Sequence, residues 1–186
     1  MLRLKVHAID PRNRANGPGM RYTIWLQGCS IGCDSCFNSL THDPDLGYWL
    51  SIDELLADIT KNKQQIEGIS ISGGEPLDQA DSLLAFLKLY EPSAIGSVLL
   101  FSGYPYREII SNPHHSAVLP YLDVLISGPF RRQMLVPGRI PASTNQEIIL
   151  LSDVYNKEEI QMVPTSQINI TAEGEIHISG IDPLVL

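Results

Sequence analysis

Cysteine is nearly absent from this chain, and its placement is informative. All three cysteines, Cys29, Cys33 and Cys36, lie within the stretch LQGCSIGCDSCFNS, and the rest of the sequence contains none. Three cysteines cannot all pair with one another, and neighbours at this spacing would cross-link little of the chain. The sequence therefore argues against a secreted disulfide scaffold, and we expect a cytoplasmic protein.

Two further absences narrow the function. The first residues, MLRLKVHAID, alternate charged and apolar side chains without a long apolar run, so they predict neither a signal peptide nor a membrane span. Positive charge is also scarce, because 13 lysines and arginines stand against 21 aspartates and glutamates, which gives a formal net charge of -8. Such a surface repels a phosphate backbone, so we expect no nucleic-acid partner and no membrane partner.

The apolar pattern predicts strands and helices in alternation. Leu2 to Ile9 and Tyr22 to Leu26 are typical of strands, and a capping box formed by Ser51 and Glu54 opens an amphipathic helix. Three further apolar segments, EGISIS, SVLLFSGY and YLDVLISGPF, predict buried strands that end at or beside a glycine. A helical segment runs from about Leu77 to Tyr90 between the first two of them.

This order indicates an α/β fold with a parallel sheet and right-handed crossovers. In such sheets the loops after the carboxyl ends of the strands form the ligand site, and the cysteine loop and the glycine turns all fall there. The 186 residues suit one domain. Near the end, QINITAEGEIHISG alternates around Glu173 and Gly174, which predicts a β-hairpin.

Three thiols in one glycine-containing loop can converge on a metal centre. Structural zinc needs four protein ligands, and here the fourth would have to be a histidine such as His42. Soft thiolates also select iron–sulfur clusters, where three cysteines would leave one iron open to a substrate. We favour the cluster; the zinc site and a coincidental trio of buried thiols remain as alternatives.

Several motifs make the interpretation more specific. They are NGPGMR (16–21), GCSIGCDSCFN (28–38), SGGEP (72–76), SGY (102–104), SGPF (127–130) and STNQ (143–146). In this order they resemble the radical S-adenosylmethionine enzymes, and within them the anaerobic ribonucleotide reductase activating proteins. Ser35 stands where the wider superfamily usually has an aromatic residue and Phe37 follows instead, as in the activating branch. Ser127 and Pro129 replace an Asp and a basic residue that are common in the family.

The resemblance implies the fold and the cofactors. The expected fold is an incomplete parallel (β/α) barrel of the radical S-adenosylmethionine type over residues 1–154. A C-terminal extension, residues 155–186, would carry the small β-hairpin and pack on the same domain. Cys29, Cys33 and Cys36 would hold a 4Fe-4S cluster whose fourth iron chelates S-adenosylmethionine. Reductive cleavage of that cofactor would then give a 5′-deoxyadenosyl radical.

The resemblance also assigns cofactor-binding residues, namely Ser35, Phe37, Ser72, Gly73, Gly74 and Glu75, and possible pocket residues, namely Ser102, Tyr104 and Asn145. Gly73 and Gly74 would let the backbone approach the methionyl ammonium group. The Glu75 carboxylate would meet that cation or orient the loop. We expect no catalytic residue beyond the cluster and the cofactor. Arg21 is expected to pair with a carboxylate, and His114 and His115 to lie in a loop.

The expected function is generation of a glycyl radical on a partner protein, most simply an anaerobic ribonucleotide reductase. An electron donor such as flavodoxin or ferredoxin would supply the reducing electron. One alternative is a related radical enzyme that modifies a peptide or a small molecule. An alternative from another class is a non-catalytic metal-binding module.

Overall fold

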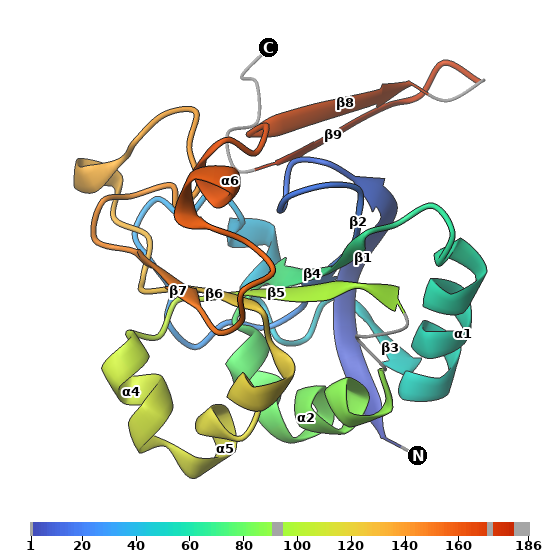
Figure 1. The fold of residues 1–186 in the computed structure, drawn as a ribbon, viewed down its shortest axis with the longest axis horizontal. Coiled ribbons are helices and arrows are strands. Elements are labelled where there is room, and N and C mark those ends of the chain that lie inside the picture. Colours follow the sequence, from blue (N-terminus) through green and yellow to red (C-terminus); the bar gives the residue numbers. More distant parts are fainter. Residues whose placement is uncertain (1, 91–94, 171–172, 181–186) are drawn as a thin grey trace.

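A seven-stranded sheet forms the centre of the computed structural model, which describes residues 2–90, 95–170 and 173–180 (Figure 1). Its strands are ordered β3-β1-β2-β4-β5-β6-β7. Their bounds are β1 (Arg3–Asn13), β2 (Arg21–Leu26), β3 (Tyr48–Ser51), β4 (Gly68–Gly73), β5 (Ser97–Ser102), β6 (Val124–Ser127) and β7 (Glu147–Leu150). The pairs β2–β4, β4–β5 and β5–β6 are parallel, whereas β1, β3 and β7 pair with their neighbours in antiparallel fashion. The predicted parallel sheet is therefore confirmed for the four central strands.

Helices fill the crossovers between the parallel strands. They are α1 (Ile52–Asn62), α2 (Ala80–Leu89), α4 (Tyr106–Ser111) and α5 (Pro113–Ser116), with α6 (Lys157–Gln161) nearer the C-terminus. Short 3-10 turns are η1 (Ser39–Thr41), η2 (Pro76–Gln79), η3 (Leu119–Tyr121) and η4 (Arg132–Met134). His114 and His115 lie in α5, so the prediction of a loop there was wrong. Asn112 caps this turn by accepting from the His114 backbone N–H at 3.0 Å, and Pro113 suits its first position.

Helix α1 forms where its capping box predicted it. The Ser51 hydroxyl accepts from the Glu54 backbone N–H at 3.2 Å, and the Glu54 carboxylate accepts from the Ser51 N–H at 3.0 Å. Ile52, Leu55 and Ile59 repeat at helical spacing and are buried against the sheet. Each such side chain contributes about 1.5–3 kcal/mol by leaving water.

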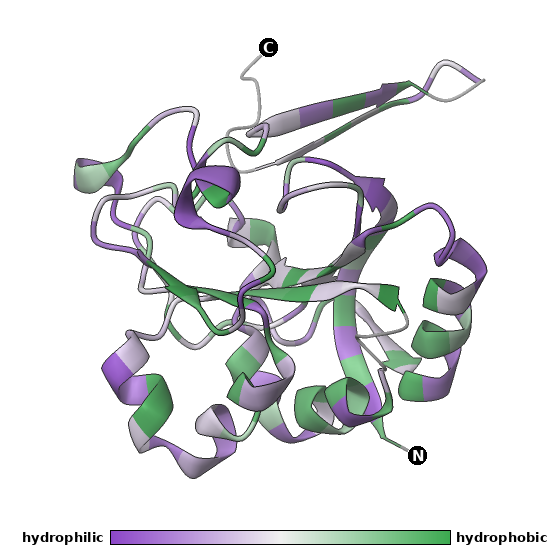
Figure 2. Cartoon of the chain, viewed as in Figure 1, coloured by the Kyte–Doolittle hydropathy of each residue, from purple (hydrophilic) through white to green (hydrophobic). Residues whose placement is uncertain are grey.

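Both faces of the central strands are buried, as parallel strands require. Val98 and Leu100 of β5 belong to the core cluster that includes α1 and α2, while Leu99 between them belongs to a second cluster with Ile160 of α6. Successive side chains of a strand point to opposite faces, so the two clusters lie on opposite sides of the sheet. The hydropathy colouring shows strongly apolar strands at this centre (Figure 2). No described helix is long and apolar enough to cross a membrane.

Arg21 is fully buried at the start of β2. Its guanidinium donates to the hydroxyls of Ser70 at 3.1 Å, Ser97 at 2.7 Å and Tyr155 at 3.2 Å, and to the carbonyls of Ile69 and Ser97. The expected carboxylate partner was wrong, because neutral acceptors take up these hydrogen bonds. Burial lowers the pKa of Arg21 below its ordinary value, and the nearby Tyr155 acts against that change.

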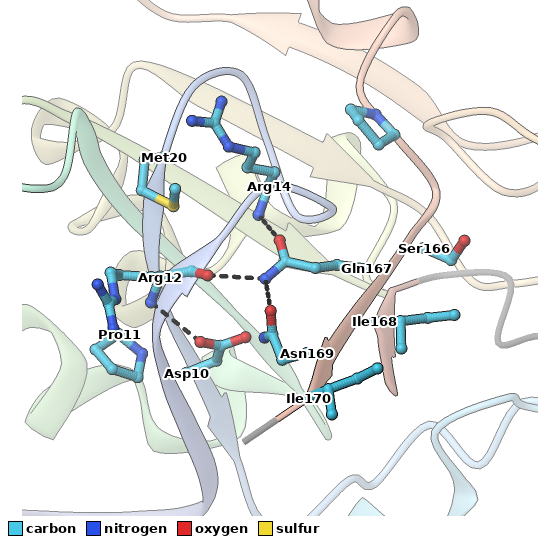
Figure 3. A pocket seen from close by; sticks show the side chains of 11 residues that line it. Asp10, Pro11, Arg12, Arg14, Met20, Ser166, Gln167, Ile168, Asn169 and Ile170 are labelled. Atoms are coloured by element: carbon cyan, nitrogen blue, oxygen red, sulfur yellow. Dashed lines mark hydrogen bonds between the residues drawn. The ribbon is translucent and has the colours of Figure 1, made fainter. Parts of the chain in front are cut away.

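The predicted C-terminal hairpin is confirmed as β8 (Ser166–Ile170) and β9 (Ile176–Gly180), a separate antiparallel pair. It is tied to the end of β1 by polar contacts (Figure 3). The Gln167 side chain accepts from the Arg14 backbone N–H at 2.6 Å and donates to the Arg12 carbonyl at 2.9 Å. Asn13 also donates to the Ser179 hydroxyl at 2.7 Å. The hairpin therefore contacts the C-terminal end of β1 and the residue that follows it.

Candidate functional site

The carboxyl ends of β2, β4, β5 and β6 meet at one edge of the sheet and surround a pocket. Its walls come mainly from the loops that follow these strands, as expected for a parallel sheet. The lining residues are Asn16, Trp25, Cys29, Ile31, Cys33, Cys36, Phe37, Asn38, His42, Ser72, Gly73, Gly74, Glu75, Phe101, Ser102, Gly103, Gly128, Phe130, Gln146 and Gly180. The structure thus brings all three cysteines, the SGGEP turn and the start of SGY to one place.

The cysteine loop leaves β2 and is closed at its base by backbone hydrogen bonds. Gly28 N–H donates to the Thr41 carbonyl at 2.8 Å, and Cys29 N–H donates to the His42 carbonyl at 3.1 Å. Gly28 and Gly32 adopt positive φ angles of 98° and 59°, which a residue with a side chain rarely takes. These bonds and turns fold the loop back on itself, so its thiols face the pocket.

The three thiols are half-buried and close enough to influence one another. Burial raises the pKa of the Cys33 thiol above its ordinary value, and the neighbouring Cys29 adds to that effect. Burial raises the pKa of Cys36 in the same way. Within the described ranges, no three His, Cys, Asp or Glu side chains are grouped as ligands of one metal ion. All three thiols line the same pocket.

The SGGEP turn packs directly on the base of the cysteine loop. Gly74 N–H donates to the Leu26 carbonyl and Glu75 N–H to the Gly28 carbonyl, each at 2.8 Å. A Cβ at Gly74 would lie 2.0 Å from the Gly28 carbonyl oxygen, and one at Gly73 would lie 2.4 Å from backbone atoms of Leu26. Glycine is required here because two backbones touch, in addition to any approach of a ligand.

Glu75 joins two of these loops from inside the protein. Its side chain is only 1% exposed, and its carboxylate accepts hydrogen bonds from Leu77 N–H at 2.9 Å, Ser102 Oγ at 2.9 Å and Gly103 N–H at 2.7 Å. Burial raises the pKa of Glu75 to about 7, against the opposite effect of these hydrogen bonds. Of the two roles considered for Glu75, these contacts favour orientation of the loops after β4 and β5.

The remaining predicted cofactor residues divide into two groups. Ser72 and Phe37 line the pocket, and Phe37 packs edge-on against Phe130 with ring centroids 5.3 Å apart. Ser35 does not line the pocket and its side chain is exposed. Its φ of 56° marks it as a turn residue of the loop, and its hydroxyl lies 3.5 Å from the carboxylate of Asp34.

Of the three possible pocket residues, Ser102 lines the pocket and the other two do not. The Tyr104 hydroxyl instead donates a hydrogen bond to the Asp78 carboxylate at 2.9 Å, on the outer side of the loops. Asn145 donates to the Pro129 carbonyl at 2.7 Å, and its neighbour Gln146, which does line the pocket, donates to the Gly128 carbonyl at 3.0 Å. The SGPF and STNQ motifs are thus bonded to each other.

Sequence reasoning missed several lining residues. Trp25 and Phe101 sit next to the last residue of their strands and are half-buried, so strand alternation could have placed them at this edge. Gly180, at the end of β9, carries no local signal for the pocket, because the tertiary placement of the hairpin alone brings it there.

Comparison with known proteins bears on this pocket. The sequence pattern of the family described as 4Fe-4S single cluster domain matches residues 15–149. The anaerobic ribonucleoside-triphosphate reductase-activating protein of Vibrio cholerae is 31% identical over 142 residues, which are 73% of this chain and 90% of that protein. The chain belongs to the radical S-adenosylmethionine family of activating proteins. The Escherichia coli K12 activating protein of the same name is 25% identical over 78% of this chain and 97% of its own length.

A second kind of radical S-adenosylmethionine activating protein is also similar. The pyruvate formate-lyase-activating enzyme of Clostridium pasteurianum is 32% identical over 66% of this chain but only 50% of its own length. Membership of this family makes the protein an enzyme. The family match ends before β8 and β9, so the hairpin lies outside the matched region.

Proposed function

We propose that this protein generates a glycyl radical on a partner protein, an anaerobic ribonucleotide reductase, with a 4Fe-4S cluster and S-adenosylmethionine. The observation that carries the proposal is the meeting of Cys29, Cys33 and Cys36 with the SGGEP turn in one pocket. Three soft thiols that line one pocket suit an iron–sulfur cluster, and they supply three of the four ligands that full ligation needs. The names of the similar proteins point to the same partner.

The three cysteines would hold the cluster, which with S-adenosylmethionine and one electron from an external donor would supply the radical chemistry that removes a hydrogen atom from the partner's glycine. The protein's own task is to position these groups and keep water away. Gly73 and Gly74 present backbone without side chains to the pocket, which leaves space for the methionyl group. Phe37 and Phe130 offer an apolar wall that suits the adenine ring. Glu75 holds two of the surrounding loops in register.

The substrate is proposed to be a protein loop because the buried carboxylate and the Gln146 amide of the pocket already bond to this chain's own groups. Glu75, the buried carboxylate, already accepts three hydrogen bonds, and Gln146 bonds to Gly128. A glycine presented from outside needs no acid or base from this chain, since hydrogen abstraction uses the adenosyl radical. A flavodoxin or ferredoxin is proposed as electron donor, and a reducing cytoplasm suits the unpaired thiols.

The finer architecture belongs to the same proposal. We take residues 1–154 as an incomplete (β/α) barrel, with its four parallel strands at the centre. Residues 155–186 are proposed as an extension packed on the same domain, and residues 171–172 and 181–186 of this range lie outside the part of the chain that the structure describes. Two contacts support that packing, because Tyr155 bonds to Ser97 at 2.8 Å and Ser179 accepts from Asn13.

The deciding experiment mixes anaerobically reconstituted protein with dithionite, S-adenosylmethionine and an anaerobic ribonucleotide reductase from the same organism. We expect an electron paramagnetic resonance doublet from coupling to the remaining glycine α-hydrogen. The Cys33→Ala variant serves as the negative control. If the wild type instead forms a new bond in a peptide or a metabolite, the alternative radical enzyme replaces this proposal. Zinc without iron–sulfur absorption in anaerobically purified protein would leave only the non-catalytic metal-binding module.

A further inference from the structure

A second set of contacts holds the cysteine loop from its outer side. Ser30 follows the first cysteine, Asp78 lies in η2 after β4, and Tyr104 follows β5. The Asp78 carboxylate accepts from Ser30 N–H at 2.7 Å, from Ser30 Oγ at 2.9 Å and from Tyr104 Oη at 2.9 Å. The two hydroxyls also lie 3.0 Å apart. One carboxylate therefore links the loops that follow three neighbouring parallel strands.

The hydrogen bonds of this network lie outside the pocket and at the surface, although the Tyr104 ring packs against the core. None of its three residues is among those that line the pocket, and the side chains of Ser30 and Asp78 are exposed. Hydrogen bonds to an ionised carboxylate are stronger than those between neutral groups, and a bond to a backbone N–H fixes the chain itself. The bond to Ser30 N–H fixes the peptide that joins this residue to Cys29. The network therefore restrains the loop at its first thiol and contributes little to the packing of the domain.

We propose that Asp78 is a positioning residue that holds Cys29 in place before the cluster is bound. The inference rests on the proposed function, in which Cys29 is a cluster ligand. The inference also assigns a role to Tyr104 of the SGY motif, which does not line the pocket. Its hydroxyl donates to Asp78 and so helps to hold that carboxylate in place. Three thiols already ordered for a cluster lose less conformational freedom when the cluster binds, so the cluster is held more tightly.

The network predicts a difference among the three cysteines of the apo-protein. Asp78→Asn replaces one carboxylate oxygen, which accepts hydrogen bonds, by an amide NH₂ group, which donates them. The backbone N–H and the hydroxyl of Ser30 then share a single acceptor oxygen. We expect Cys29 to react with N-ethylmaleimide about fivefold to tenfold faster in this variant, which corresponds to the loss of about one hydrogen bond. Cys33 and Cys36 should change less, because their part of the loop lies beyond the contact. Tyr104→Phe removes one bond and should give a smaller increase at Cys29.

Asp81→Asn is the matched control, since it removes the same charge from an exposed aspartate three residues away. Asp81 contacts His114 Nδ1 at 2.8 Å, and within the described part of the chain it makes no hydrogen bond to the cysteine loop. Site-resolved alkylation is measured by mass spectrometry beside the melting temperature, and iron release to a chelator is measured on reconstituted protein. Faster alkylation at Cys29 and faster iron loss at an unchanged melting temperature, with a control like wild type, would establish the role.

Two outcomes would overturn it: equal Cys29 reactivity in Asp78→Asn and wild type, or a uniform increase at all three cysteines together with a lowered melting temperature. The alkylation step needs neither S-adenosylmethionine nor a partner protein. A wild type that fails to form a glycyl radical would therefore refute the proposed function while leaving the role of Asp78 in loop order to be judged separately.

Discussion

Glu75 makes the stability of the apo-protein depend on pH in a particular direction. Its pKa is raised from 4.5 to about 7 because the carboxyl group is buried. The folded protein therefore keeps this proton to a higher pH than the unfolded chain does. The stabilising contribution of the protonated group is complete below about pH 4.5 and is lost as the pH rises through about 7.

The size of the effect follows from the shift. One pKa unit corresponds to about 1.4 kcal/mol, so the whole shift is worth about 3 kcal/mol, of which about 2.5 kcal/mol falls between about pH 5 and about pH 8. Glu75→Gln does not titrate and should lack this component. Its amide would also face the Gly103 N–H, donor against donor, which adds a destabilisation that does not vary with pH.

The assay is urea unfolding of the apo-protein at several pH values across that range, for wild type and Glu75→Gln. The free energy of unfolding of wild type minus that of the variant should fall by about 2.5 kcal/mol from the low end to the high end. Glu147→Gln, an exposed glutamate of β7, is the control and should run parallel to wild type. If the Glu75→Gln profile also runs parallel, the buried carboxyl does not titrate as argued.

Three further predictions concern the site and the core. Cys33→Ala should remove most of the iron from reconstituted protein while far-ultraviolet circular dichroism stays unchanged, because the loop lies at the rim of the sheet; retained iron would contradict its ligand role. Gly74→Val should displace the cysteine loop and lower the iron content, since its Cβ would lie 2.0 Å from the Gly28 carbonyl oxygen, whereas Gly138→Ala, with nothing within 4 Å, should keep its iron. Arg21→Met should lower the free energy of unfolding by about 3 kcal/mol, because several buried acceptors lose their donor; a loss below about 1 kcal/mol would show that those acceptors find other partners.

The sequence by itself determined the elements whose signals are local. The capping box of α1 lies within four residues, the apolar runs of β4, β5 and β6 are continuous, and the three cysteines stand in one loop at the end of β2. These features predict the parallel centre of the sheet and the edge at which the site lies, because parallel strands place their carboxyl ends together. The antiparallel strands β3 and β7 escaped notice, since four residues each give too little periodicity for a prediction.

Only the tertiary structure decided what the individual side chains do. Ser30 and Tyr104 meet across 74 positions of sequence, and Asp78 joins them, so no local pattern could assign Tyr104 to the outer side of the loops. Arg21 was expected to meet a carboxylate, whereas the folded strands surround it with hydroxyls and carbonyls. Gly74 is required by a backbone that approaches from another strand. Such contacts depend on how distant segments pack. The partners of a side chain are its neighbours in space, and the sequence pattern of its own segment contains no information about them.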